Sequence, residues 1–225
     1  MTMVMMATTA MMMDTIMNHN IEDKYVFTQA DTNQVAFLYD AFIKKYFPKD
    51  EVKPLSHIKR MMEAGYYKII TISSSPNNLD EAKGNLTPII NKVLGVAFIT
   101  AAPNCSIYLL DYLAIDKNYR SKGIGGLLLQ EVAEKYVEDK PLLIETESIA
   151  SSKSMEEKQM RLRRNAFYEK NAATLTDLVT EIYGVEYTIW IMNEKQLDLI
   201  DELSKLYHFM VDDKHYESKV FIPKR

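Results

Sequence analysis

The sequence predicts a domain of mixed α/β (α+β) class, and three observations support this prediction. Short β-branched and aromatic runs follow amphipathic stretches along most of the chain. Residues 109–136 pass from an apolar strand through a basic, glycine-rich turn directly into an amphipathic helix. The composition, 47% apolar and 26% charged over 225 residues, is that of a globular protein long enough to bury one ordinary core.

The predicted elements follow the order β-α-α-β-β-β-α-β-α-β-β, with one further helix and a short strand near the C-terminus. The predicted strands are residues 25–29, 66–73, 92–101, 107–115, 141–147, 174–181, 185–192 and 220–222. The predicted helices are residues 30–47, 54–64, about 122–137, 154–170 and 194–208.

Capping and turn residues set the limits of the early elements. The first helix begins near Asp31 and stops at Pro48, because proline cannot continue a helix. Gly65 ends the second helix, and the β-branched and aromatic run after it is typical of a strand. Turn-forming residues fill residues 74–91, so we expect a long excursion between two hairpin strands there.

The later elements have similar signals. Residues 148–153 form a polar loop, after which Ser154 and Glu157 make a capping box that opens a helix. A turn at Tyr183 and Gly184 joins the two strands that follow. Apolar residues at helical spacing then predict the additional C-terminal helix; they are Leu197, Ile200, Leu203 and Tyr207.

The N-terminal segment is rich in methionine but has no Lys or Arg ahead of its apolar stretch, so it makes a poor signal peptide. Met13 and Met17 are alternative start sites. We expect residues 1–23 to be disordered, residues 24–192 to form the folded domain, and residues 193–225 to form a helical extension.

Charge and cysteine content exclude several classes of function. The formal net charge is −4 with acids and bases interleaved, which argues against a nucleic-acid surface. The single Cys105 excludes an internal disulfide and fits a reducing, cytoplasmic location. The four histidines lack metal-binding spacing, so we expect no metal site. No run approaches the ~18 apolar residues of a membrane span.

The glycine-rich turn has the properties of a phosphate cradle. Its glycines let the backbone approach a ligand, and the helix that follows offers unpaired N–H groups to an anion. The turn consists of Arg120, Ser121, Lys122, Gly123, Ile124, Gly125 and Gly126. The spacing fits neither a dinucleotide fingerprint nor a P-loop.

The pattern Arg-x-x-Gly-x-Gly in this turn resembles the acyl-CoA pyrophosphate loop of the GNAT superfamily of N-acetyltransferases. A second stretch, RRNAFYEKN at residues 163–171, resembles the late helix of that superfamily, and the element order agrees over about three quarters of the chain. The resemblance implies a mixed, mostly antiparallel central sheet flanked by helices. It also implies acetyl-CoA as acyl donor, with the pyrophosphate on the turn and pantetheine along the strand at Leu113, Ala114 and Ile115.

Tyr168 matches the tyrosine that in such enzymes returns a proton to the leaving thiolate. A phenol suits this role because its pKa of roughly 10 keeps it protonated at neutral pH. The alternative is that Phe167 and Tyr168 are aromatic packing on an amphipathic helix. The superfamily continues with a glycine and an aromatic, where this chain has Ala172 and Ala173, so Asn171 is the candidate for the left-handed helix cap.

Three carboxylates are candidates on the acceptor side. Alternation puts Asp111 on one face with Leu109, Leu113 and Ile115. By resemblance, Asp111 or a water relay removes a proton from the attacking ammonium; alternatively, Asp111 is satisfied by nearby donors. Glu145 and Glu147 project to one face and suit a cationic amine, or they form a solvated strand end.

Basic residues on the late helix leave two readings open. Arg161, Arg163 and Arg164 recognise a carboxylate or the 3′-phosphate of CoA, or they form an ordinary basic helix face. A covalent route through Cys105 is disfavoured because no histidine partner is evident.

The sequence therefore predicts an N-acetyltransferase that moves an acetyl group from acetyl-CoA to a primary amine of a small molecule in a ternary complex. The alternatives are a CoA-binding regulatory protein without turnover and a protein N-terminal acetyltransferase. The acceptor is not identified. It also stays open whether the C-terminal helix covers the cleft or forms a homodimer interface.

Overall fold

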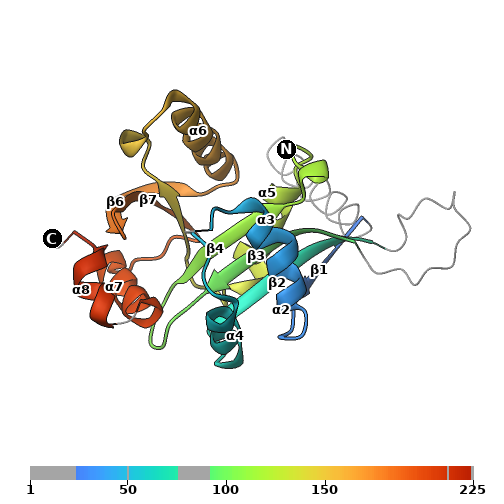
Figure 1. The fold of residues 1–225 in the computed structure, drawn as a ribbon, viewed down its shortest axis with the longest axis horizontal. Helices are drawn as coiled ribbons and strands as arrows, with labels where there is room; N and C mark the ends of the chain where they lie inside the picture. The colour runs from blue at the N-terminus through green and yellow to red at the C-terminus, as the bar shows by residue number, and fades with distance from the viewer. Residues whose placement is uncertain (1–23, 50, 76–91, 212, 224–225) are drawn as a thin grey trace, which may run out of the picture.

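The computed structural model describes residues 24–49, 51–75, 92–211 and 213–223. Within these residues, eight strands form one sheet in the order β1-β2-β3-β4-β5-β7-β6-β8, with helices against both faces (Figure 1). The strands are β1 (Tyr25–Gln29), β2 (Tyr67–Ser74), β3 (Val93–Thr100), β4 (Tyr108–Ile115), β5 (Leu142–Glu147), β6 (Thr174–Ile182), β7 (Val185–Met192) and β8 (Val220–Phe221). Neighbouring strands run antiparallel, except for the parallel pair β4 and β5.

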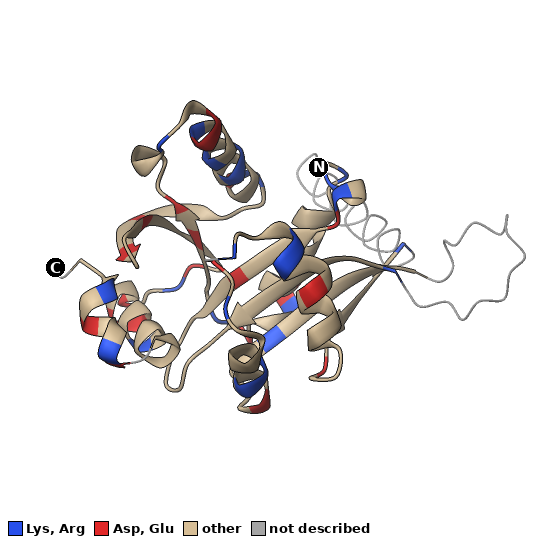
Figure 2. Ribbon diagram, in the orientation of Figure 1, with Lys and Arg blue, Asp and Glu red and all other residues tan. Residues whose placement is uncertain are grey.

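The helical segments are α2 (Val35–Leu38), η1 (Tyr39–Ile43), α3 (Lys44–Tyr46), α4 (Leu55–Glu63), η3 (Lys117–Tyr119), α5 (Ile124–Glu131), η4 (Val132–Tyr136), η5 (Ile149–Ser151), α6 (Met155–Lys170), α7 (Leu199–Met210) and α8 (Asp213–Lys219). None of the helices in the described residues is long and apolar enough to cross a membrane. Basic and acidic residues are interleaved on α6, α7 and α8, as Figure 2 shows.

The sheet has two covered faces. On the face called here the α5 face, side chains such as Ile72, Ile99 and Ile144 pack with Leu128 and Leu129 of α5. The opposite face, called the α4 face, has two neighbouring clusters. One lies under α2, η1 and α4 and includes Val35, Phe42, Ile58, Ile69 and Phe98; the other lies under α7 and includes Leu109, Leu143, Ile189, Leu203 and Leu206.

The predicted fold class, with a mostly antiparallel sheet flanked by helices and an additional C-terminal helix, is confirmed. The helix expected at residues 30–47 is a continuous run of α2, η1 and α3 that contains a π-helical turn. The helix expected from residue 194 begins only at Leu199, because the Asp198 side chain caps it by accepting from the N–H groups of Ile200 and Asp201. Helix α8 was not predicted from the sequence.

Two expectations lie outside the described residues. They are the disorder expected at residues 1–23 and most of the excursion expected at residues 74–91.

The capping box at the start of α6 is present in altered form. Ser154 Oγ accepts from the Glu157 N–H at 3.1 Å, while the Glu157 carboxylate reaches back to the N–H of Lys153 at 2.6 Å.

Strands β4 and β5 form a fork. Their parallel pairing ends at Leu110 and Ile144, so Asp111 and Glu145 are the first residues beyond the last pair. Asp111 is also the extra residue of a β-bulge, because Leu110 pairs with Ile99 of β3 and Tyr112 pairs with the adjacent Phe98.

The bulge corrects the expected alternation along β4. Leu109 packs on the α4 face, whereas Leu113 and Ile115 pack against the α5 cluster, so these three side chains do not share a face. The extra residue shifts the two-residue period by one position. The Asp111 carboxylate meets Tyr67, which belongs to the α4 face.

The end of α6 also differs from expectation. Asn171 has φ −99° and does not adopt the left-handed conformation; Ala172 does, with φ 64°. The Asn171 side chain instead donates to the carbonyl of Phe167 at 2.7 Å. A hydrogen bond to its own helix end thus holds Asn171 outside the left-handed region. Ala172, a residue with a Cβ, adopts the left-handed conformation instead.

Candidate functional site

The turn at residues 120–126 forms a backbone cradle at the start of α5. Ser121 and Gly123 both have positive φ, 61° and 81°, and Gly123 is the N-cap of the helix. Among the described residues, no acceptor is recorded for the backbone N–H groups from Ser121 to Gly126. Successive free N–H groups at a helix N-terminus attract an anion.

The two basic side chains of the turn are held beside aromatic rings. Arg120 Nε donates to the carbonyl of Ile115 at 3.0 Å, and its guanidinium lies 4.6 Å from the centre of the Tyr46 ring. The Lys122 ammonium lies 5.1 Å from the centre of the Tyr119 ring. These contacts keep two positive charges at the cradle.

The glycines inside α5 allow another helix to approach closely. A Cβ at Gly125 would lie 3.4 Å from the Phe167 ring, and one at Gly126 would collide with the Asn171 side chain. Both neighbours belong to the end of α6 where Tyr168 lies. The two motifs that the sequence analysis identified are therefore packed against each other.

The outer half of β4 carries Leu113, Ala114 and Ile115. Beyond Leu110 this strand pairs only with β3, so its edge toward β5 has no ladder partner among the described residues. The edge runs from Asp111 at the fork to Ile115, whose carbonyl accepts the Arg120 hydrogen bond. An extended chain with amide groups could add to such an edge.

The two fork carboxylates have different surroundings. Asp111 is ion-paired with Lys53, with Nζ to Oδ1 at 2.5 Å, and its other oxygen accepts a hydrogen bond from the Tyr67 hydroxyl. Both oxygens are thus occupied, as in the alternative that Asp111 is satisfied by nearby donors.

Glu145 accepts a hydrogen bond from the Tyr207 hydroxyl of α7. Burial raises the pKa of the Glu145 carboxyl to about 8, with the nearby positive charge of Lys53 lowering it and the negative charge of Asp111 raising it. A carboxyl with a pKa near neutrality is suited to take up and release a proton.

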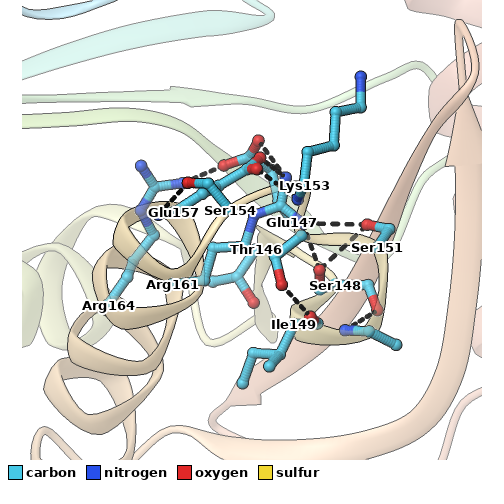
Figure 3. A network of polar contacts seen from close by, with 12 residues as sticks. Thr146, Glu147, Ser148, Ile149, Ser151, Lys153, Ser154, Glu157, Arg161 and Arg164 are labelled. Carbon is cyan, nitrogen blue, oxygen red and sulfur yellow. Dashed lines mark hydrogen bonds and ion pairs between the residues drawn. The ribbon is translucent and has the colours of Figure 1, made fainter.

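Glu147 points elsewhere than Glu145. It forms ion pairs with Arg161 at 3.1 Å and Arg164 at 3.0 Å, both on α6 (Figure 3). Arg161 is buried and also binds Glu157 at 2.5 Å, Ser151 Oγ at 2.9 Å and the carbonyl of Ser148. This network fastens α6 to β5. Glu145 and Glu147, which were expected to project to one face, thus have different partners.

The basic residues of α6 are correspondingly divided. Arg161 and Arg164 are engaged in the Glu147 network, although Arg164 stays partly exposed, whereas Arg163 is exposed and outside that network. The structure favours a structural role for Arg161 over ligand contact, because both terminal nitrogens of its guanidinium donate to protein acceptors.

Tyr168 is buried in the cluster of the α5 face and packs against Phe167 with ring centres 5.1 Å apart. Burial raises the pKa of its hydroxyl to about 12, with Arg164 acting in the opposite direction. The phenol is therefore protonated at neutral pH. It lies on the α5 face of the sheet, whereas the carboxylates of Asp111 and Glu145 contact residues of the α4 face.

Three residues at the fork were missed by the sequence analysis: Lys53, Tyr67 and Tyr207. Lys53 and Asp111 are 58 positions apart in the chain, and Tyr207 and Glu145 are 62 apart. Tyr207 was identified only as part of an apolar helix face. The one sequence signal that marks it is its hydroxyl, since a phenol buried on a core face needs an acceptor.

Two further expectations concern cysteine and metal. Cys105 is buried, and burial raises the pKa of its thiol to about 11, so it is a poor nucleophile. Among the described residues, no group of three or more His, Cys, Asp or Glu is arranged to hold a metal ion.

Comparisons with known proteins show what this chain is similar to. The family described as the acetyltransferase (GNAT) domain matches residues 84–171, which contain the cradle, the fork and Tyr168. The YjbC protein of Bacillus subtilis (strain 168), whose name assigns it provisionally to the acetyltransferases, is 24% identical over 183 residues, covering 77% of this chain and 83% of that protein.

Solved structures agree on the fold. A GNAT-family protein from Bacteroides thetaiotaomicron is similar with a TM-score of 0.57 and 16% identity, over 86% of this chain and 97% of that one. Arabidopsis thaliana NAA60 in complex with acetyl-CoA has a TM-score of 0.53 and 10% identity, over 75% of this chain and 97% of that one. A GNAT-family protein from Desulfovibrio desulfuricans has a TM-score of 0.52 and 15% identity, over 75% of this chain and 98% of that one.

Proposed function

Because the chain belongs to the GNAT superfamily, we propose that it is an N-acetyltransferase that moves an acetyl group from acetyl-CoA to a primary amine of a small molecule. The observation that carries the proposal is the placement of the cradle. Its free N–H groups lie at the start of α5, whose glycines contact the end of α6 beside Tyr168. One donor molecule could therefore extend from the cradle to the fork.

The donor half of the proposal rests on backbone groups. The N–H groups of residues 121–126 hold the pyrophosphate, with Arg120 and Lys122 adding charge. The unpaired edge of β4 at Leu113, Ala114 and Ile115 holds the pantetheine amides. The solved complex of NAA60 with acetyl-CoA, which has the same fold, is consistent with this donor.

The transfer needs a base and an acid on either side of the thioester. Glu145 takes the proton of the acceptor ammonium, and its raised pKa suits that task, whereas both oxygens of Asp111 already have partners. The amine nitrogen then forms its bond to the acetyl carbon, the carbon–sulfur bond breaks, and Tyr168 gives its proton to the departing thiolate. The second proton of the nitrogen is lost to solvent as the amide forms, and Tyr168 regains a proton from solvent. Asp111 holds Lys53 in place beside Glu145.

The contacts of the carboxylates bear on the acceptor. Asp111 is neutralised by Lys53, and Glu147 by two arginines. The fork therefore lacks the uncompensated negative charge that the sequence analysis expected to attract a cationic amine. We propose an acceptor with a single amine rather than a polycation.

Calorimetric titration with acetyl-CoA and with free CoA tests the donor site, using the Gly123→Glu variant. Glutamate there adds a negative charge to the proposed anion site, and we expect acetyl-CoA affinity to fall at least tenfold. Gly65→Glu is a matched control, because Gly65 has φ 80° and, like Gly123, open space around its Cβ position. It carries the same backbone strain away from the cradle.

The outcomes separate the alternatives. Binding that Gly123→Glu weakens and Gly65→Glu preserves supports the donor site. Binding of this kind without turnover on a panel of primary amines, amino acids and peptide N-termini would favour a CoA-binding regulatory protein. A folded wild-type protein that binds neither ligand would contradict the proposed function.

A further inference from the structure

The segment after β7 is anchored in the core on the α4 face. Leu203, Leu206 and Tyr207 of α7 are almost fully buried against strands β4, β5 and β7. The Glu202 carboxylate accepts from the N–H of Ser106 at 2.5 Å, just before β4 begins. The segment therefore holds a fixed position relative to the fork.

One polar contact joins this segment to the fork. The Tyr207 side chain is 2% exposed, and its hydroxyl donates to Oε1 of Glu145. Glu145 is the first residue of β5 beyond the last pair with β4. No other polar partner is recorded for the Tyr207 hydroxyl in the part of the chain that the structure describes. Phenylalanine would fill the same apolar site, so packing does not explain the hydroxyl.

We propose that Tyr207 is a positioning residue for Glu145, supplied to the acceptor side of the fork by the C-terminal segment. This inference rests on the proposed function. The residue lies outside residues 84–171, the part of the chain that matches the acetyltransferase domain family. The C-terminal segment is then a component of the site and not a cover over it.

The contact has two chemical consequences. A donor fixed on Oε1 sets the rotation of the carboxylate and leaves Oε2 for the proton of the incoming ammonium, as no described residue hydrogen-bonds to Oε2. The hydroxyl also stabilises the ionised form of Glu145, because hydrogen bonds to charged acceptors are stronger than those to neutral ones.

The other groups that face Glu145 come from three elements. They are Lys53 from the loop before α4, Asp111 from β4 and Tyr187 from β7. Of these, Lys53 favours the ionised carboxylate and Asp111 disfavours it. Tyr187 is a phenol whose pKa burial raises to about 12, so it stays neutral where Glu145 titrates. These three are unchanged in a Tyr207→Phe variant.

The test is the pH profile of kcat/KM for acetyl transfer to an amine, measured for wild type, Tyr207→Phe, Glu145→Gln and the double variant. Loss of the rising limb in Glu145→Gln assigns that limb to Glu145. We expect Tyr207→Phe to move the limb upward by about one pH unit, because it removes a hydrogen bond to a charged group. At pH values below the shifted limb, the kcat/KM of Tyr207→Phe is then about tenfold lower than that of wild type, and at pH values above the limb the two are equal.

Three controls keep the result specific. The KM for acetyl-CoA stays unchanged in Tyr207→Phe, and the double variant has the flat profile of Glu145→Gln. Tyr216→Phe in α8 also removes a phenol hydroxyl next to the α7 cluster and leaves the limb in place. A loss of packing alone would instead lower activity by the same factor at every pH.

The possible failures are distinguishable. If wild type transfers acetyl groups and Tyr207→Phe leaves the limb unmoved, the positioning role is wrong and the proposed function stands. If wild type binds acetyl-CoA but transfers nothing to any amine tested, the proposed function fails and the positioning role fails with it.

Discussion

Tyr168 illustrates how one buried side chain links the fold to the proposed chemistry. It packs on the α5 face beside Phe167, and burial raises the pKa of its hydroxyl to about 12. Both the packing role and the acid role that the sequence left open are compatible with this position. Burial favours the protonated phenol, which is the form that a proton donor needs.

Removing only the hydroxyl separates these two roles. We expect Tyr168→Phe to lower kcat about 10²-fold, the lower end of the usual contribution of a general acid, while the Kd for acetyl-CoA stays within twofold. Rapid-mixing kinetics and calorimetry measure the two quantities. Tyr136→Phe is the control, because Tyr136 packs at the border of the same cluster and no role is proposed for it. An unchanged kcat would leave Tyr168 as packing alone.

At the residue level, motifs with a fixed local spacing could be recognised from the sequence, and contacts across the fold could not. Gly123 and Gly125 lie in one turn, so their spacing alone predicts a cradle, which the free N–H groups support. Lys53 and Tyr207 reach the fork from segments far away in the chain. Their partners follow from the sheet order and the bulge, neither of which a linear pattern contains.

At the level of elements, the end of α6 carries strain that the sequence suggested but misplaced. Ala172 adopts φ 64°, where a Cβ costs energy, while Asn171 stays outside the left-handed region. The reason is the Asn171 side chain, which bonds to its own helix end and packs where Gly126 of α5 leaves room. Contact between two helices thus overrides a local preference.

Ala172→Gly should relieve this strain. We expect the free energy of unfolding to rise by about 1 kcal/mol, because glycine adopts positive φ without the Cβ penalty. This is the net gain after subtracting the greater entropy that glycine gives the unfolded chain. Urea denaturation monitored by circular dichroism measures the change. Ala166→Gly, at an exposed position inside the same helix, should lower stability by about 1 kcal/mol. Equal destabilisation by both variants would contradict the assigned strain.

Element boundaries were predictable wherever a cap or a breaker marks them. Gly65 ends α4 and Ser154 begins α6, as expected. The start of α7 was placed too early because Leu197 continues the apolar spacing, whereas Asp198 determines the helix start by capping. The π-helical turns at η1 and η4 and the β4 bulge could not be predicted, since each inserts one residue without a distinctive sequence.

For the whole molecule, the fork is a polar site between two apolar layers. The α5 cluster lies on one face of the sheet and the clusters under α4 and α7 lie on the other, and Glu145 is placed where β4 and β5 separate. Burial there raises the pKa of Glu145 from 4.5 to about 8. A group that is hard to ionise in the folded protein makes stability depend on pH.

The sign of that dependence follows from proton counts. Between pH 4.5 and about 8 the folded protein keeps the Glu145 proton and the unfolded chain loses it, so stability falls as pH rises. His57 acts in the opposite sense below about pH 6.5, because burial lowers its pKa in the folded state. The interval from pH 6.5 to 8 therefore isolates Glu145 from His57.

We expect the free energy of unfolding of wild type to fall across this interval by up to about 1.4 kcal/mol per pH unit, and that of Glu145→Gln to change much less. Urea denaturation at several pH values between 6.5 and 8 measures both slopes. Glu169→Gln, which removes an exposed carboxylate from α6, should keep the wild-type slope. If Glu145→Gln also has the wild-type slope, the Glu145 carboxyl is already ionised in the folded protein at these pH values. The base proposed for the acceptor side must then be another group.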